Sequence, residues 1–179
     1  RERLEREGVN ARSVSLNILE QWQGMEGNGQ FRFTPPTHSL LAFRQALLEH
    51  EAEGGCEGRL ARYTANFETL KAGMAKMGFH PYLDKDKQGV IITTFLFPDD
   101  PKFDFEAFYS RLSDRGMVIY PGKLTKADCF RIGTIGRLFP QDVTNLLSGI
   151  RETLEDMGVS LPVRQVDASS ASSKLRSFA

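Results

Sequence analysis

The sequence has few cysteines and histidines, and this scarcity excludes most metal and disulfide chemistry. Its 179 residues contain two cysteines, Cys56 and Cys129, and three histidines that do not cluster. A structural zinc site needs four nitrogen or sulfur ligands in paired spacing, and no such pairing occurs. Two cysteines are also too few for a disulfide framework in a domain of this size. We therefore expect no metal site and two reduced thiols, as in an intracellular protein.

Long apolar runs and an excess of one charge are missing too. The longest apolar run, residues 90–97, is far shorter than the roughly 20 residues that a membrane span requires. The formal net charge is zero, because 23 basic side chains balance 23 acidic ones. Nucleic-acid binders and polybasic membrane binders need a basic excess. We expect no nucleic-acid or membrane partner, and a cytoplasmic location.

Familiar catalytic motifs are absent as well. No segment matches a P-loop, a dinucleotide fingerprint, HExxH, GxSxG or an EF-hand loop, and a single GxxG from Gly133 to Gly136 is weak. A lysine that forms a Schiff base must be desolvated, whereas the lysines here lie in charged contexts, and Lys123 and Lys126 lie in a turn. The residues alone therefore indicate no nucleophile–base pair.

What is present is a succession of helix and strand patterns. Apolar spacing predicts helices over 13–23, 39–53, 57–77, 103–115 and 140–157, and strands over 89–97, 117–120 and 128–135. Glycines from position 24 onward are expected to end the first helix, and residues 31–33 to be briefly extended. The order over residues 55–158 indicates an α/β class, of the two-layer α+β kind, in which helices cover a small sheet. Periodicity is lost from about residue 160, and the tail from 159 to 179 is expected to be disordered.

Two places carry unusual chemistry. The first is Thr34, in a Thr-Pro-Pro-Thr segment ahead of a helix, where a hydroxyl on a stiff loop is well placed to bind a phosphate. The alternative is an ordinary helix entry in which Thr37 or Ser39 acts as the N-cap. The second is Arg131, a permanently charged guanidinium in an apolar strand, which suits a carboxylate or phosphonate in a bidentate contact. The alternative there is a structural ion pair at a strand edge.

Four segments, in this order, resemble one enzyme family: Phe31–His38, Ile91–Leu96, Phe103–Tyr109 and Ile119–Gly133. The sequence resembles the C-terminal part of the 2-aminoethylphosphonate–pyruvate aminotransferases, which are class V, fold-type I enzymes, over about residues 9 to 158. The resemblance implies pyridoxal 5'-phosphate as cofactor, homodimers, and transfer of an amino group from 2-aminoethylphosphonate to pyruvate, giving phosphonoacetaldehyde and L-alanine in phosphonate catabolism. It also implies that Arg131 binds the substrate anion and that Thr34 contacts the cofactor phosphate across the dimer.

The same resemblance divides the chain and limits what it contains. It implies that residues 1–54 are a piece of a large domain with its interdomain helix, and that residues 55–158 are the C-terminal small domain. The family's pyridoxal-binding lysine lies upstream of the segment that matches Arg1, so no lysine here is assigned that role. Because the chain starts at Arg1, we expect a fragment that is inactive alone. The alternatives are a non-catalytic remnant or interaction module, or a fragment of an alanine–glyoxylate or serine–pyruvate aminotransferase.

Overall fold

The computed structural model describes residues 1–122 and 128–165, which fall into two compact units. Unit 1 comprises Arg1–Ala52 and unit 2 comprises Glu53–Ala179. Residues 123–127, including Lys123 and Lys126, and residues 166–179 lie outside the described residues.

Unit 1 consists of helices. They are α1 (Glu2–Glu7), the short 3-10 helix η1 (Gly8–Asn10), α2 (Ile18–Asn28) and α3 (Thr37–Ala52). Of residues 1–52, all of which are described, Leu19 is the one buried side chain. It packs so closely against Gly8 that a Cβ there would lie 2.7 Å from the Leu19 Cβ. Unit 1 therefore has regular helices but no core of its own.

Helix α2 corrects the expected helix over residues 13–23. It begins at Ile18, because the side chain of Asn17 accepts a hydrogen bond from the Glu20 N–H and so caps the first turn. The helix runs through the glycines at 24 and 27 and ends at Gly29, whose φ of 72° is left-handed. An interior glycine costs a helix about 1 kcal/mol but does not stop it. No strand forms over residues 31–33, where a brief extended piece is expected.

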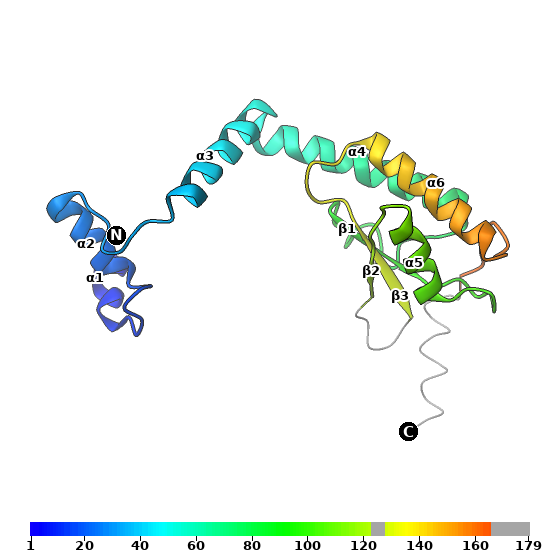
Figure 1. Cartoon of the computed structure of the whole chain (residues 1–179), viewed down its shortest axis with the longest axis horizontal. Coiled ribbons are helices and arrows are strands. Elements are labelled where there is room, and N and C mark those ends of the chain that lie inside the picture. Colours follow the sequence, from blue (N-terminus) through cyan, green and yellow to red (C-terminus); the bar gives the residue numbers. More distant parts are fainter. Residues whose placement is uncertain (123–127, 166–179) are drawn as a thin grey trace, which may run out of the picture. The chain divides into compact units, whose positions relative to one another are not determined.

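Unit 2 is a small antiparallel sheet covered by helices. Its elements are α4 (Gly55–Lys76), β1 (Ile92–Leu96), α5 (Phe105–Asp114), β2 (Tyr120–Pro121), β3 (Cys129–Gly133) and α6 (Pro140–Asp156). The strands lie in the order β1-β3-β2, so β3 is central. Helices α4 and α6 run side by side, and α5 packs on α6 (Figure 1). The expected arrangement, with helices over a small sheet, is confirmed.

The core of unit 2 lies between these helices and one face of the sheet. Phe95 and Phe130 from the sheet have centroids 5.7 Å apart, and Phe79 meets both rings edge-on. Leu70 and Met74 of α4 join this cluster. All five side chains are almost fully buried, and burial of each contributes about 1.5–3 kcal/mol.

Two expected boundaries in unit 2 are wrong for local reasons. The strand expected over 117–120 shrinks to β2, because the Met117 N–H still bonds to the Leu112 carbonyl at the end of α5. The disordered tail expected from residue 159 starts too early. Val159 and Val163 are buried in the core, and the Val163 N–H donates to the Met77 carbonyl at 2.8 Å. Backbone bonds and two apolar side chains hold this segment without any periodic pattern.

Candidate functional site

Arg131 lies on the face of the sheet that the helices do not cover. Strand β3 alternates, so its neighbours Phe130 and Ile132 point into the core while Arg131 is half-buried on the opposite face. In the register of the sheet, Arg131 pairs with Thr94 of β1 on one side and with Tyr120 of β2 on the other. Directly paired residues project to the same face, so these three side chains form one row across the sheet.

A hydrogen bond at Nε orients the Arg131 side chain. Its Nε donates a hydrogen bond to the Pro121 carbonyl, 3.2 Å away on the neighbouring strand. Within the described residues, no carboxylate forms an ion pair with Arg131 and no other hydrogen bond reaches its terminal nitrogens. The hydrogen bond at Nε therefore fixes the orientation of the planar guanidinium. Its two terminal nitrogens can each donate an N–H to an anion.

The two neighbours of Arg131 in the row bring hydroxyl groups. Thr94 is half-buried, and Tyr120 is 55% exposed. The Tyr120 ring leans over β3, because a Cβ built on Gly133 would lie 3.9 Å from its Cε2 atom. Hydroxyls can donate to an anion beside a guanidinium. Neither residue could be assigned to this site from the sequence, because the register between distant strands cannot be deduced from either strand alone.

Helix α4 fixes the turn that follows β3. The Arg62 Nη1 donates to the carbonyls of Gly136 and Leu138, at 2.7 and 2.9 Å, and Asn66 donates to Leu138 at 2.8 Å. Arg62 is in turn paired with Glu53, which also binds Arg59 at 2.8 Å. The hydrogen bonds from Arg62 and then Arg59 lower the pKa of Glu53 from about 4.5 to about 2. This network holds in place the end of the strand that carries Arg131. The sequence alone does not predict it.

Thr34 lies in unit 1, on the loop ahead of α3. Its side chain is exposed, and no hydrogen bond within the described residues reaches its hydroxyl. The expected caps are not seen in the form proposed. The Thr37 hydroxyl donates to the Pro35 carbonyl, and Ser39 already lies inside the first turn, because α3 begins at Thr37. The Pro36 carbonyl accepts the first helical hydrogen bond, from the Leu40 N–H at 3.0 Å. Thr34 and Arg131 belong to different units.

No other feature of the described residues competes as a centre for this chemistry. Within that part of the chain, no three His, Cys, Asp or Glu side chains gather as metal ligands. No helix there is long and apolar enough to cross a bilayer. A cavity between α4 and the segment before β1 is not lined by Arg131 and is considered separately below.

Comparisons with known proteins match the sequence motifs. No protein-family model matches the chain. The chain is 51% identical over 145 residues to the 2-aminoethylphosphonate–pyruvate transaminases of Vibrio vulnificus and Vibrio parahaemolyticus, and 49% identical to that of Salmonella heidelberg. Each match covers 80% of this chain and 40% of the relative, so the chain spans well under half the length of these relatives. The resemblance stated from the motifs is confirmed over this length.

Solved structures support the fold. An alanine–glyoxylate aminotransferase from Nostoc sp. gives a TM-score of 0.67 at 24% identity, covering 78% of this chain and 36% of that one. A ureidoglycine–glyoxylate aminotransferase from Bacillus subtilis gives 0.64 at 20% identity, covering 94% and 43%. The α/β fold expected from the sequence is confirmed, and parts of these aminotransferase structures share it. Enzymes of this kind generally depend on pyridoxal phosphate.

Proposed function

We propose that this chain is part of an enzyme that transfers the amino group of 2-aminoethylphosphonate to pyruvate, giving phosphonoacetaldehyde and L-alanine in phosphonate catabolism. The observation that carries the proposal is Arg131, whose Nε is held by the Pro121 carbonyl while its other N–H groups have no partner in the described residues. The 51% identity to transaminases of that name supports the same reading.

The two substrates of this reaction each carry one anionic group that a guanidinium can bind. Arg131 binds the phosphonate of 2-aminoethylphosphonate in one half of the reaction and the carboxylate of pyruvate in the other. Both groups accept two parallel hydrogen bonds from a guanidinium fork. Because Nε is already engaged, the two terminal nitrogens of Arg131 set the direction from which the anion approaches.

Thr34 fits the role of a phosphate contact for pyridoxal phosphate. Its hydroxyl is exposed on a proline-stiffened loop and has no internal partner in the described residues. In a homodimer, Thr34 of one subunit contacts the cofactor phosphate in the other. When bound, pyridoxal phosphate supplies the electron sink for transamination. No lysine of this chain is assigned to bind it.

The domain assignment follows from the same proposal. Residues 1–54 are a piece of the large domain with the interdomain helix, and residues 55–158 are the small domain that carries Arg131. The contrast between a unit with one buried side chain and a unit with a full core supports this division.

The test is a chimera. The segment of the Vibrio vulnificus transaminase that matches this chain is replaced by the chain itself, and alanine formation from 2-aminoethylphosphonate and pyruvate is followed with the cofactor present. We expect activity in the chimera and none in the chain alone. A soluble, cofactor-loaded chimera without activity on this substrate pair would overturn the proposal.

Arg131→Ala in the chimera should lower kcat/KM for 2-aminoethylphosphonate by about ten- to a hundredfold, since a hydrogen bond to a charged group contributes about 1.5–3 kcal/mol. Cofactor absorbance should stay unchanged. The matched control is Arg137→Ala, an exposed arginine on the same segment. Equal kinetics for the two variants would contradict the role of Arg131.

Thr34→Ala should instead weaken cofactor retention by about tenfold, the effect of one lost hydrogen bond to a charged group, with little effect on KM. Thr34→Ser, which keeps the hydroxyl, is the control. Pyridoxal phosphate affinity is read by dialysis followed by absorbance. The same affinity in all three proteins would exclude a phosphate contact at Thr34.

Two other functions make different predictions. A non-catalytic remnant or interaction module predicts that the chimera retains no turnover on any amino donor. A fragment of an alanine–glyoxylate or serine–pyruvate aminotransferase predicts a preference for those substrate pairs. One substrate panel on the chimera therefore separates all three.

A further inference from the structure

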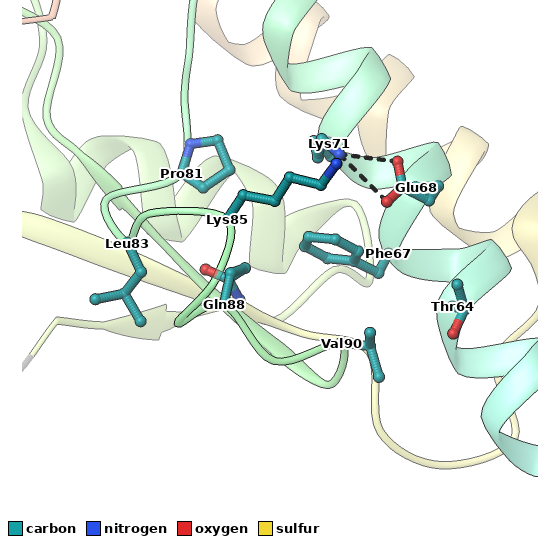
Figure 2. Close-up of a pocket in the computed structure, with 9 residues that line it drawn as sticks. All are labelled: Thr64, Phe67, Glu68, Lys71, Pro81, Leu83, Lys85, Gln88 and Val90. Atoms are coloured by element: carbon teal, nitrogen blue, oxygen red, sulfur yellow. Dashed lines mark hydrogen bonds and ion pairs between the residues drawn. The ribbon is translucent and has the colours of Figure 1, made fainter.

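A cavity of about 320 Å³ lies in unit 2, and Arg131 is not among the residues that line it. One wall is a face of α4, and the other is the segment that leads into β1 (Figure 2). Its lining residues are Thr64, Phe67, Glu68, Lys71, Pro81, Leu83, Lys85, Gln88 and Val90. An engineered apolar cavity of about 150 Å³ already holds benzene, so this volume accepts a substituted single ring.

The walls of the cavity are mostly apolar. Phe67 presents its ring from α4, and Pro81, Leu83 and Val90 come from the facing segment (Figure 2). Removing an apolar ring from water against such walls is favourable at about 25 cal/mol per Å² of buried surface. The shape and lining therefore favour the apolar body of a small ligand, and aromatic rings pack well against Phe67.

The charged groups of the lining leave one cation unmatched. Lys71 is neutralised by Glu68, whose carboxylate oxygens lie 3.0 and 3.2 Å from its ammonium. Lys85 extends from the facing segment across the space toward α4 (Figure 2). Within the described residues, no ion pair or hydrogen bond engages the Lys85 ammonium. The lining thus carries a net positive charge that an anionic group would complement.

Gln88 supplies the second polar feature. Its Nε2 donates to the carbonyls of Gly89 and Ile92, at 2.6 and 2.9 Å, which fixes the orientation of the amide. Its Oε1 has no hydrogen-bond partner within the described residues, but it is buried out of reach of a water-sized probe, so a ligand in the cavity does not contact it.

We propose that this cavity binds a small aromatic carboxylic acid. The ring lies against Phe67, and the carboxylate pairs with Lys85. This proposal does not depend on the transamination reaction, and its test needs neither pyridoxal phosphate nor the chimera.

The test is a titration of the isotope-labelled 179-residue chain with para-hydroxybenzoate, followed by two-dimensional NMR. We expect saturable shifts in the Gln88 side-chain amide and in the backbone of residues 64–71 and 81–90. Benzoate keeps the carboxylate and should bind about as tightly, whereas phenol lacks it and should bind about tenfold more weakly, the effect of one polar contact. Equal affinity for benzoate and phenol, or no saturation below about 10 mM, would overturn the proposal.

Three variants locate the site. Lys85→Met should reduce the affinity for para-hydroxybenzoate to that for phenol and leave phenol binding unchanged. Lys87→Met removes the same charge from the same segment, but Lys87 is paired with Asp84 at 2.8 Å and does not line the cavity, so binding should persist. Thr64→Trp should abolish binding of all three compounds, because the larger side chain fills the space. Equal effects of the two lysine variants would show a general attraction of anions and refute the site.

Discussion

The two units of the chain bury their apolar side chains to very different degrees. In unit 2, the rings of Phe95, Phe108 and Phe130 are completely buried beneath three helices. In unit 1, helix α3 also carries large apolar side chains, yet Leu41 and Phe43 are about 60% exposed. This difference shows that the apolar pattern determines which element forms and which of its faces is suited to burial. The burial itself requires a second layer of helices or strands packed against that face.

Truncating one phenylalanine in each unit gives the largest expected contrast. Phe130→Ala should destabilise unit 2 by about 3–5 kcal/mol, because it removes a fully buried ring that touches several others. Phe43→Ala on α3 should change the free energy of unfolding by less than about 0.5 kcal/mol. Urea unfolding followed by circular dichroism measures both. A similar loss for the two variants would mean that α3 packs against a surface in solution.

The N-caps of two helices allow a finer comparison. Asp104 caps α5 by accepting from the Ala107 N–H at 2.8 Å, and Asn17 caps α2 by accepting from the Glu20 N–H at 3.1 Å. Asp104→Ala should lower the stability of unit 2 by about 1 kcal/mol, because α5 is packed into its core. Asn17→Ala should only increase fraying of α2, seen as lost helical signal at constant unfolding midpoint. A shifted midpoint for Asn17→Ala would show that unit 1 unfolds cooperatively after all.

The smallest expected effect is the acid sensitivity of Glu53 at the start of unit 2. Its pKa is lowered from about 4.5 to about 2, first by the hydrogen bond from Arg62 and then by that from Arg59. Since the folded-state pKa lies below the unfolded one, the carboxylate stabilises unit 2 above about pH 4.5 and loses this contribution as the pH falls toward about 2.

Glu53→Gln should therefore flatten the pH dependence of unit 2 stability in that acid window and leave its slope near neutral pH unchanged. Glu57→Gln, an exposed acid on α4, is the control. Thermal unfolding at stepped pH provides the measurement. If the stability of Glu53→Gln and of the unchanged chain falls equally with pH in the acid range, Glu53 does not stabilise unit 2 through these hydrogen bonds.

Much of unit 2 could be predicted from the sequence, because the side chains that its apolar patterns place on one face are the ones that the structure buries. The helices and the central strand were found within a few residues, and Arg131 stood out as a charge in an apolar strand. Thr94 and Tyr120 could not be placed beside it, because the pairing of strands far apart in the chain depends on the whole fold. The hydrogen bonds from Arg62 to the turn after β3 could not be predicted for the same reason, since they join residues more than 70 positions apart.

Unit 1 and the end of unit 2 were harder to predict. Helix α2 was misplaced because Asn17 starts it and its interior glycines do not end it. Residues 159–165 were missed because no periodic pattern marks a segment held mainly by backbone bonds. Apolar periodicity identifies elements that have a regular side-chain pattern. It does not identify segments that are held in place by backbone hydrogen bonds to neighbouring elements.

That last segment has a practical consequence for handling the protein. Gln165 bonds to the His80 N–H and to the Leu96 carbonyl, and Val163 lies so close to Gly78 that a Cβ there would sit 2.3 Å from its carbonyl oxygen. An insertion after Gly158 would detach residues 159–165 from the turn at Met77 and expose this part of the core to solvent.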